Sequence, residues 1–125
     1  MNFLKKLFKR KEKTLLTEIE PLVDKVIIKS YRDIAKKING APSAKTSDEK
    51  ILDIYRKVLI AFKAEASQRG ERIPAVNLNS IALKFMQVYE MSGEEFFNEH
   101  LEYEIIKYHN EGLREDYKRH EITFF

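Results

Sequence analysis

Apolar side chains recur every three or four residues along most of this chain, and that periodicity is the feature that most limits its fold. Such spacing gathers the apolar side chains on one face of an α-helix, whereas a strand needs strict alternation, and no convincing alternation is present. The first long helix is expected to follow the Thr17–Glu20 capping box and to stop at Asn39–Gly40. Its predicted buried face consists of Val23, Val26, Ile27, Tyr31, Ile34 and Ile38.

A second helix is predicted after the loop that contains Pro42. Thr46 and Glu49 offer a capping box for it, or Ser47 caps it alone, and Gly70 marks its end. The apolar stripe of this helix comprises Ile51, Ile54, Tyr55, Val58, Phe62 and Ala66.

Two more helices are expected in the second half of the chain. Asn77 or Asn79 caps a shorter one, and Ser92 with Glu95 forms a capping box for a long one that weakens near Gly112. The apolar face of the shorter helix is Leu78, Ile81, Ala82, Phe85, Val88 and Tyr89.

These elements predict an all-α fold, a compact bundle of four main helices preceded by an additional short amphipathic helix. A chain of 125 residues is long enough to bury a substantial core without disulfides or metals. The expected division is a basic amphipathic segment at 1–14 and a helical bundle domain at 15–125.

The positive charge of this chain is concentrated at its start. Residues 1–13 hold six lysines or arginines and one glutamate, so their net charge is +5 and the rest of the chain carries −2 of the total of +3. The segment also places apolar residues within one arc, and it therefore offers a possible contact with an anionic membrane surface through Phe3, Leu4, Leu7 and Phe8. Nucleic acid is not an expected partner, because the basic charge does not belong to the folded domain.

No arrangement typical of an enzyme is present. The four glycines are isolated, so no glycine-rich phosphate loop exists, and His100 with Glu104 would supply only two metal ligands. The chain has no cysteine, which removes thiolate metal sites and disulfides and suits a reducing cytoplasm. We expect no catalytic residues, no cofactor and no metal.

The last long helix carries an unusual surface. Residues 90–104 contain six glutamates and no lysine or arginine, and helical spacing puts Glu95, Glu99, Glu102 and Ile106 opposite the core positions Phe97, Leu101, Ile105 and Tyr108. Such a face is either solvated or, with apolar anchors at its flank, a surface for a basic partner. The predicted partner-binding surface, hereafter the acidic face, is Glu95, Phe96, Glu99, Glu102, Tyr103 and Ile106.

Several short motifs occur in an order that resembles the small helical immunity proteins that protect bacteria from the NAD(P)-degrading toxin of type VI secretion. They span roughly residues 16–114, and each one is a pattern on a helix face. The matching residues are Thr17, Ile19, Glu20 and Asp24-Lys25; Glu49-Lys50 with Leu52, Arg56, Val58 and Leu59; Leu78 with Ser80-Ile81-Ala82 and Lys84; and Gly112-Leu113-Arg114.

The resemblance implies a non-enzymatic cytoplasmic protein, a monomer or homodimer, that binds an NAD(P)-consuming or nucleotide-using toxin domain and covers its cleft. The chain departs from the family in its basic N-terminal segment, in longer connections around 39–47 and 68–77, and in an added C-terminal tail. The alternative is a peripheral membrane or assembly adaptor anchored by residues 1–13, and the third is an enzyme of an unrecognised class.

Overall fold

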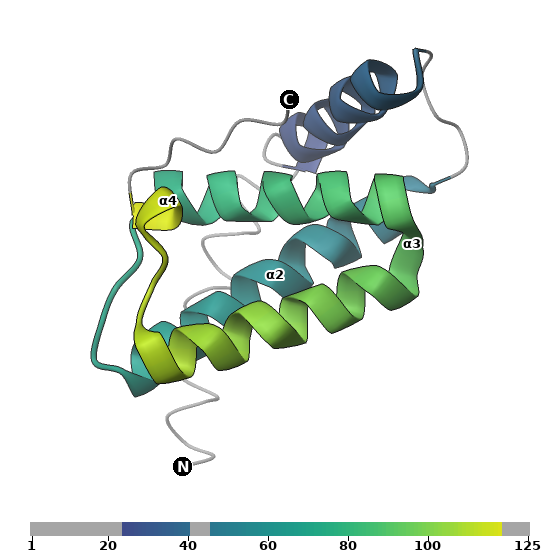
Figure 1. The fold of residues 1–125 in the computed structure, drawn as a ribbon. Coiled ribbons are helices and arrows are strands. Elements are labelled where there is room, and N and C mark those ends of the chain that lie inside the picture. The colour runs from purple at the N-terminus through teal and green to yellow at the C-terminus, as the bar shows by residue number, and fades with distance from the viewer. Residues whose placement is uncertain (1–23, 41–45, 119–125) are drawn as a thin grey trace.

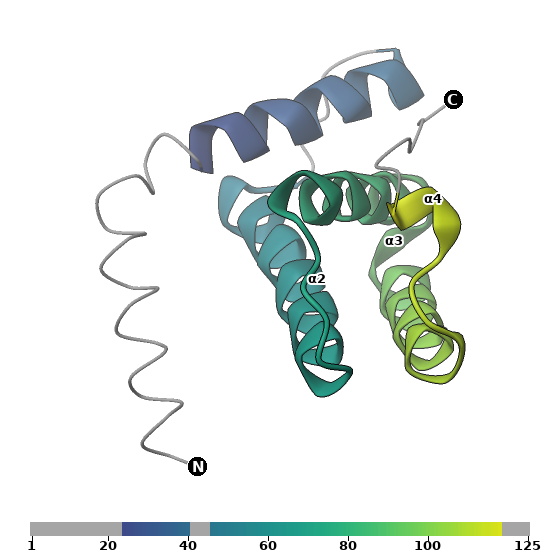
Figure 2. The ribbon, with the colours of Figure 1, turned by 90° about the vertical axis from the view of Figure 1, so that its left-hand side faces the viewer.

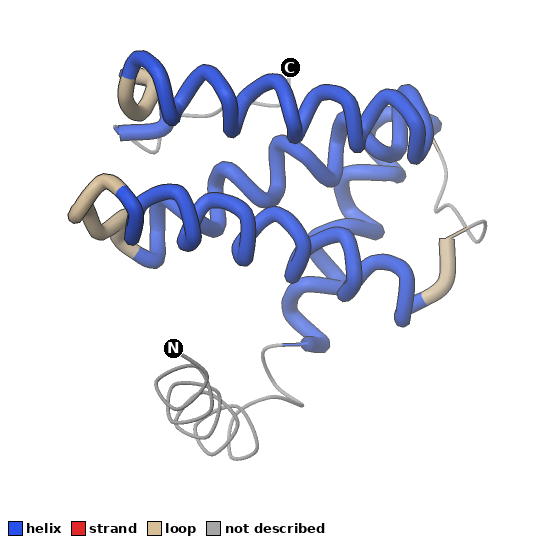
Figure 3. Tube along the Cα trace, turned by 90° about the horizontal axis from the view of Figure 1, so that it is seen from below, coloured by secondary structure: helices blue, strands red, loops and turns tan. Residues whose placement is uncertain are grey.

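The computed structural model describes residues 24–40 and 46–118, and this part of the chain is all-helical (Figures 1 and 3). Residues 24–39 form one helix, followed by α2 (Asp48–Gln68), α3 (Ala75–Glu111) and α4 (Glu115–Lys118). Gly93 divides α3 into two halves, so the four predicted main helices are all present and α4 adds one further turn. The predicted N-terminal amphipathic helix lies outside the described residues, as does the Thr17–Glu20 capping box.

The helices enclose the core between α2 and the two halves of α3. In Figure 1 the halves of α3 run back along each other, and Figure 2 shows helix 24–39 lying across the end of this group. The second half of α3 runs in the same direction as α2, since Lys50 Nζ is 2.6 Å from Glu94 Oε1 near their starts and His109 Nδ1 is 2.8 Å from Glu65 Oε1 near their ends.

The ends of α2 follow the local sequence signals. Ser47 caps the helix alone, because its side chain accepts a hydrogen bond of 3.2 Å from the Lys50 amide. At the other end Gly70 adopts φ +69°, its amide donates to the Ser67 carbonyl, and the Glu71 amide donates to that of Ala66 over 2.8 Å. This pair of hydrogen bonds is a Schellman motif, which needs a left-handed residue at the glycine position.

Gly93 reverses the direction of the chain. Its φ of +87° and ψ of −179° lie outside the helical region and in a part of conformational space that essentially only glycine occupies. The two halves of α3 consequently pack on each other, with the Phe85 and Phe97 ring centroids 6.1 Å apart and those of Tyr89 and Phe97 5.8 Å apart. The break falls one residue after Ser92, and within the described residues no hydrogen bond joins the side chains of Ser92 and Glu95 to the backbone, so the capping box predicted there is wrong.

Most of the predicted apolar faces are buried. The core includes Ile27, Tyr31, Ile34, Ile51, Ile54, Val58, Phe62, Leu78, Ile81, Ala82, Phe85, Phe97, Leu101 and Tyr108. Val26 is 57% exposed, so its predicted burial is wrong. The buried side of this helix follows Ile27, Tyr31, Ile34 and Ala35, and Val26 lies off that stripe.

The predicted start of the third helix is also wrong. The helix begins at Ala75 after Pro74, without a side-chain cap, and Asn77 is buried within its first turn. The Asn77 amide donates to the carbonyl oxygens of Tyr117 and Lys118 over 2.7 and 2.6 Å. Asn77 therefore links α4 to the start of α3. Capping rules consider only near neighbours in the sequence, so they do not predict this tertiary contact.

Gly93→Ala should lower the free energy of unfolding by about 1–3 kcal/mol, because alanine is strained in this backbone conformation. No heavy atom lies within 4 Å of an added Cβ, so the effect would come from the backbone and not from a clash. Denaturant unfolding measures the difference, and the neighbouring exposed substitution Ser92→Ala should change it by less than about 0.5 kcal/mol. Equal stability of the two variants would contradict this account of the turn.

Candidate functional site

The acidic face lies on the solvent side of the second half of α3. Glu95, Glu99 and Glu102 are exposed, while Phe97, Leu101 and Tyr108 on the opposite side of the same helix are buried. The apolar members of the face are open to solvent as well, with exposed fractions of 51% for Phe96, 59% for Tyr103 and 53% for Ile106. Six neighbouring side chains on one helix therefore combine three carboxylates with three large apolar groups.

Three of the six glutamates between 90 and 104 make contacts with other parts of the chain. Glu90 accepts hydrogen bonds from the hydroxyl of Tyr31 and, over 2.7 Å, from the amide of Asn39. Glu94 pairs with Lys50, as described above. The third is the buried Glu104, which pairs with Arg114.

Glu104 is 2% exposed, and its Oε1 accepts a hydrogen bond of 2.8 Å from Arg114 Nη1. The Arg114 guanidinium also holds Asp116 through two hydrogen bonds of 3.1 Å. Burial, followed by the negative charge of Glu104, raises the pKa of the neighbouring Tyr117. Tyr117 is almost fully buried and its hydroxyl has no hydrogen-bond partner in the described part of the chain. The network joins the second half of α3 to α4.

The three remaining glutamates are the charged members of the acidic face. Within residues 24–40 and 46–118, none of Glu95, Glu99 and Glu102 makes a hydrogen bond or an ion pair. Like charges four residues apart on a helix repel weakly, so Glu95 and Glu99 do not gain from each other. Their charge is thus available to an external partner.

Each aromatic member of the face contacts the side chain four residues further along the same helix. The Phe96 ring stacks on His100 with centroids 6.0 Å apart, and His100 in turn contacts the buried Phe85 ring at 5.2 Å. Lys107 Nζ lies 5.9 Å from the centre of the Tyr103 ring. Such support restricts the side chains before binding, which reduces the entropy that a partner must overcome.

His100 serves the packing of this face. Burial lowers the pKa of its imidazole, so the neutral form is favoured at neutral pH. Among the described residues no cluster of three or more His, Cys, Asp or Glu side chains is placed to hold a metal ion. Likewise, no helix in this part of the chain has the length and apolar content needed to cross a bilayer.

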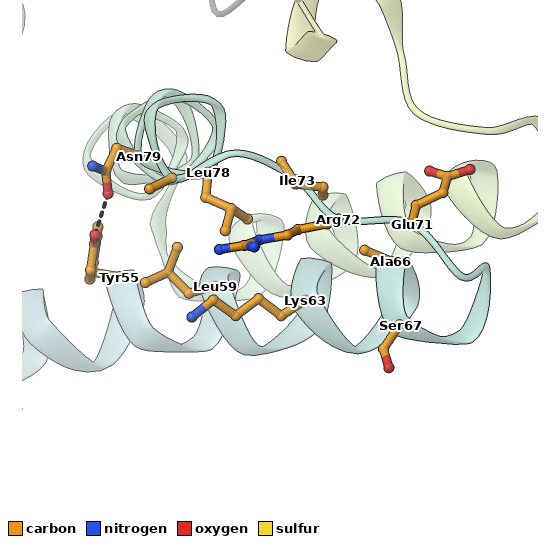
Figure 4. Close-up of a pocket in the computed structure, with 11 residues that line it drawn as sticks. Tyr55, Leu59, Lys63, Ala66, Ser67, Glu71, Arg72, Ile73, Leu78 and Asn79 are labelled. Carbon is orange, nitrogen blue, oxygen red and sulfur yellow. Dashed lines mark hydrogen bonds between the residues drawn. The ribbon is translucent and has the colours of Figure 1, made fainter. Parts of the chain in front are cut away.

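One concave feature escaped the sequence predictions. An open groove of about 540 Å³ lies between α2 and the segment from Glu71 to Asn79 (Figure 4). Its cationic side chains, Lys63 and Arg72, have the spacing of ordinary surface residues, and the groove forms only where the connection before α3 folds back along α2. No local sequence signal identifies such a site.

The acidic face lies on the exposed side of a helix, and such a surface suits protein docking better than catalysis, which needs an enclosed pocket. Comparison with protein-family models, with curated proteins and with solved structures gives no match for this chain.

Glu104 is buried and paired whereas Glu102 is exposed, so alanine substitutions at these two positions should differ strongly in their effect on the free energy of unfolding. Glu104→Ala should lower the free energy of unfolding by about 1–3 kcal/mol, because it removes a buried carboxylate and its charged hydrogen bond. Glu102→Ala, two residues away and exposed, should change it by less than about 0.5 kcal/mol. Urea titrations followed by circular dichroism would measure the unfolding free energy of both variants. A loss of stability in Glu102→Ala as large as that in Glu104→Ala would contradict the different roles of the two glutamates.

Proposed function

We propose that this chain is an immunity protein that binds a bacterial toxin domain through the acidic face and blocks its cleft. The observation that carries the proposal is the set of exposed carboxylates of Glu95, Glu99 and Glu102, which have no partner within the described part of the chain, beside three exposed apolar side chains on the same helix.

The charge of the face selects a basic partner surface. Three carboxylates within two helical turns attract lysine and arginine side chains at a distance and speed up association. Phe96, Tyr103 and Ile106 supply the apolar contacts that slow dissociation, because buried aromatic and aliphatic anchors dominate the energy of interfaces. The two kinds of side chain have separate kinetic effects, which the variants below exploit.

Several of the residues that resemble the immunity family have a structural role instead. Val58, Leu78, Ile81 and Ala82 are buried, and Arg114 holds Glu104, so these shared positions build the bundle. The acidic face lies outside them. This arrangement fits a family in which a common helical scaffold carries a contact surface that differs with the toxin.

Inhibition by occlusion needs no reactive group. Residues 94–111 of α3 form a rod about 27 Å long, given a rise of 1.5 Å per residue, and such a rod spans a typical substrate or cofactor cleft. An NAD(P)-consuming or nucleotide-using toxin has a cleft that must stay open to its substrate, and a helix laid across it prevents entry.

The direct test needs the toxin that the proposal requires, sought among the products of neighbouring genes, with growth protection and binding kinetics as readouts. The double substitution Glu99→Lys and Glu102→Lys should slow association about tenfold at low salt, with a smaller effect at high salt. Asp33→Lys with Glu49→Lys makes the same change in net charge at exposed positions outside α3 and should leave association within about twofold. If the Asp33→Lys, Glu49→Lys variant lost binding while the Glu99→Lys, Glu102→Lys variant kept it, the interface would not be the acidic face.

Ile106→Asp should act on dissociation instead. Replacing an apolar anchor by a charge that becomes buried should raise the dissociation rate about thirtyfold, the equivalent of about 2 kcal/mol. Surface plasmon resonance separates the two rates, and circular dichroism should show unchanged helix, because the side chain does not contribute to the core. An unchanged dissociation rate would show that Ile106 does not contact the partner.

Removal of residues 1–13 separates the immunity proposal from the membrane-adaptor alternative. The acidic face and the buried contacts described above contain none of these residues, so the shortened chain should fold and still protect cells from the toxin. Only sedimentation with anionic vesicles should fall, if the segment contacts lipid. A folded shortened chain that no longer protects would contradict the proposed interface.

A further inference from the structure

Helix 24–39 carries a line of lysines on the side that faces away from the core. Its buried side consists of Ile27, Tyr31, Ile34 and Ala35. The exposed cations on the opposite side, hereafter the basic ridge, are Lys25, Lys29, Lys36 and Lys37. Residues 24–39 hold five lysines or arginines and two aspartates, so their net charge is +3 although residues 14–125 together carry −2.

The charge of the basic ridge is not neutralised by the fold. None of its four lysine side chains makes a hydrogen bond or an ion pair within residues 24–40 and 46–118. Of the two aspartates in the helix, Asp24 is paired, with its Oδ2 3.4 Å from Arg56 Nη2. Only the exposed Asp33 remains beside the ridge, so four lysines face solvent against one carboxylate.

The place of helix 24–39 in the bundle keeps the basic ridge apart from the acidic face. In Figures 1 and 2 the first half of α3 lies between this helix and the second half of α3. Steps of four and seven residues keep side chains in one line along a helix, so three of the lysines present their charges over a length of about 16 Å. These three are Lys25, Lys29 and Lys36. An extended anionic surface can therefore meet the ridge without approaching the acidic face.

We infer that the basic ridge binds the surface of an anionic lipid membrane, and that residues 1–13 contact the same membrane. Stable membrane attachment generally needs two signals, and a basic patch next to an amphipathic segment supplies both. Residues 1–13 carry +5 together with Phe3, Leu4, Leu7 and Phe8. The ten residues 14–23 that join them to the helix span at most about 35 Å, so both basic parts can reach one surface.

The chemistry of the ridge favours lipid over nucleic acid. The exposed residues of helix 24–39 include no aromatic side chain on which a base could stack, and Arg32 is paired with Asp48 over 2.8 Å. Val26 is 57% exposed beside the lysines, and an apolar group among cations suits the boundary between headgroups and acyl chains. The same membrane would repel the acidic face, which leaves that face available to a protein partner. The inference does not depend on the proposed toxin contact.

The test is co-sedimentation of the full chain with vesicles made of equal parts of phosphatidylcholine and phosphatidylglycerol. A lysine close to an anionic surface strengthens binding about fivefold, so the triple substitution Lys25→Gln, Lys29→Gln and Lys36→Gln should weaken it about a hundredfold. Vesicles of phosphatidylcholine alone should bind the parent chain far more weakly. The three side chains are exposed, so the circular dichroism spectrum should stay that of the parent.

The matched control removes three positive charges outside helix 24–39, through Arg72→Gln, Lys107→Gln and Lys118→Gln. Charges farther from the membrane than the screening length contribute little, so this variant should bind within about twofold of the parent. The inference is overturned if both triple variants lose the same affinity or if neutral vesicles bind the parent as tightly. It is equally overturned if glycerol phosphate at the lipid's own concentration releases the chain, or if duplex DNA at equal phosphate concentration binds it more tightly than the vesicles do.

A second measurement tests which side of the molecule meets the membrane. The chain has no cysteine, so a fluorescent dye can be attached to one introduced thiol. Asp33→Cys places the dye beside the basic ridge and Glu102→Cys places it on the acidic face, both at exposed positions. Nitroxide-labelled lipid in the anionic vesicles should quench the dye at Asp33→Cys strongly and the dye at Glu102→Cys weakly. Equal quenching, or stronger quenching at Glu102→Cys, would overturn the inference even if the vesicles bind the chain.

Discussion

A backbone with φ +87° and ψ −179° is open to glycine and to essentially no other residue, and Gly93 adopts it midway along α3. Without this turn, residues 75–111 would form a single rod whose two halves could not pack on each other. With it, Phe85 and Phe97 meet, and the core closes around Phe62. The same turn fixes which side of residues 94–106 faces solvent, so the acidic face also depends on Gly93.

Local signals in the sequence located much of the fold. Ser47 as a cap and Gly70 as a helix end were predictable because each depends on a hydrogen bond between near neighbours. The burial of Asn77 and Tyr117 was not, since each acquires its place only when α4 docks against the start of α3. The groove around Arg72 escaped prediction for the same reason, because it exists only between segments that are brought together by the tertiary fold.

The exposed position of the acidic face was predictable from helical period alone, but its available charge was not. Helical spacing already places Glu104 on the core side of the helix, among Phe97, Leu101 and Tyr108. Only the contacts in the structure distinguish the paired residues Glu90 and Glu94 from the unpaired ones. A buried carboxylate is retained only with a partner, whereas an exposed unpaired one costs little. Of the six carboxylates, three therefore have partners within the described part of the chain, and Glu95, Glu99 and Glu102 are exposed without one.

The central claim is that the outer side of residues 94–106 meets the partner while the core side stays unchanged. Side-chain NMR during titration with the toxin domain that the proposal requires tests it directly. The account predicts that the Ile106 methyl signals and the ring signals of Phe96 and Tyr103 shift as the complex forms, whereas those of Phe62 and Phe85 remain in place. Binding that leaves Phe96, Tyr103 and Ile106 unperturbed and shifts signals elsewhere would contradict the account.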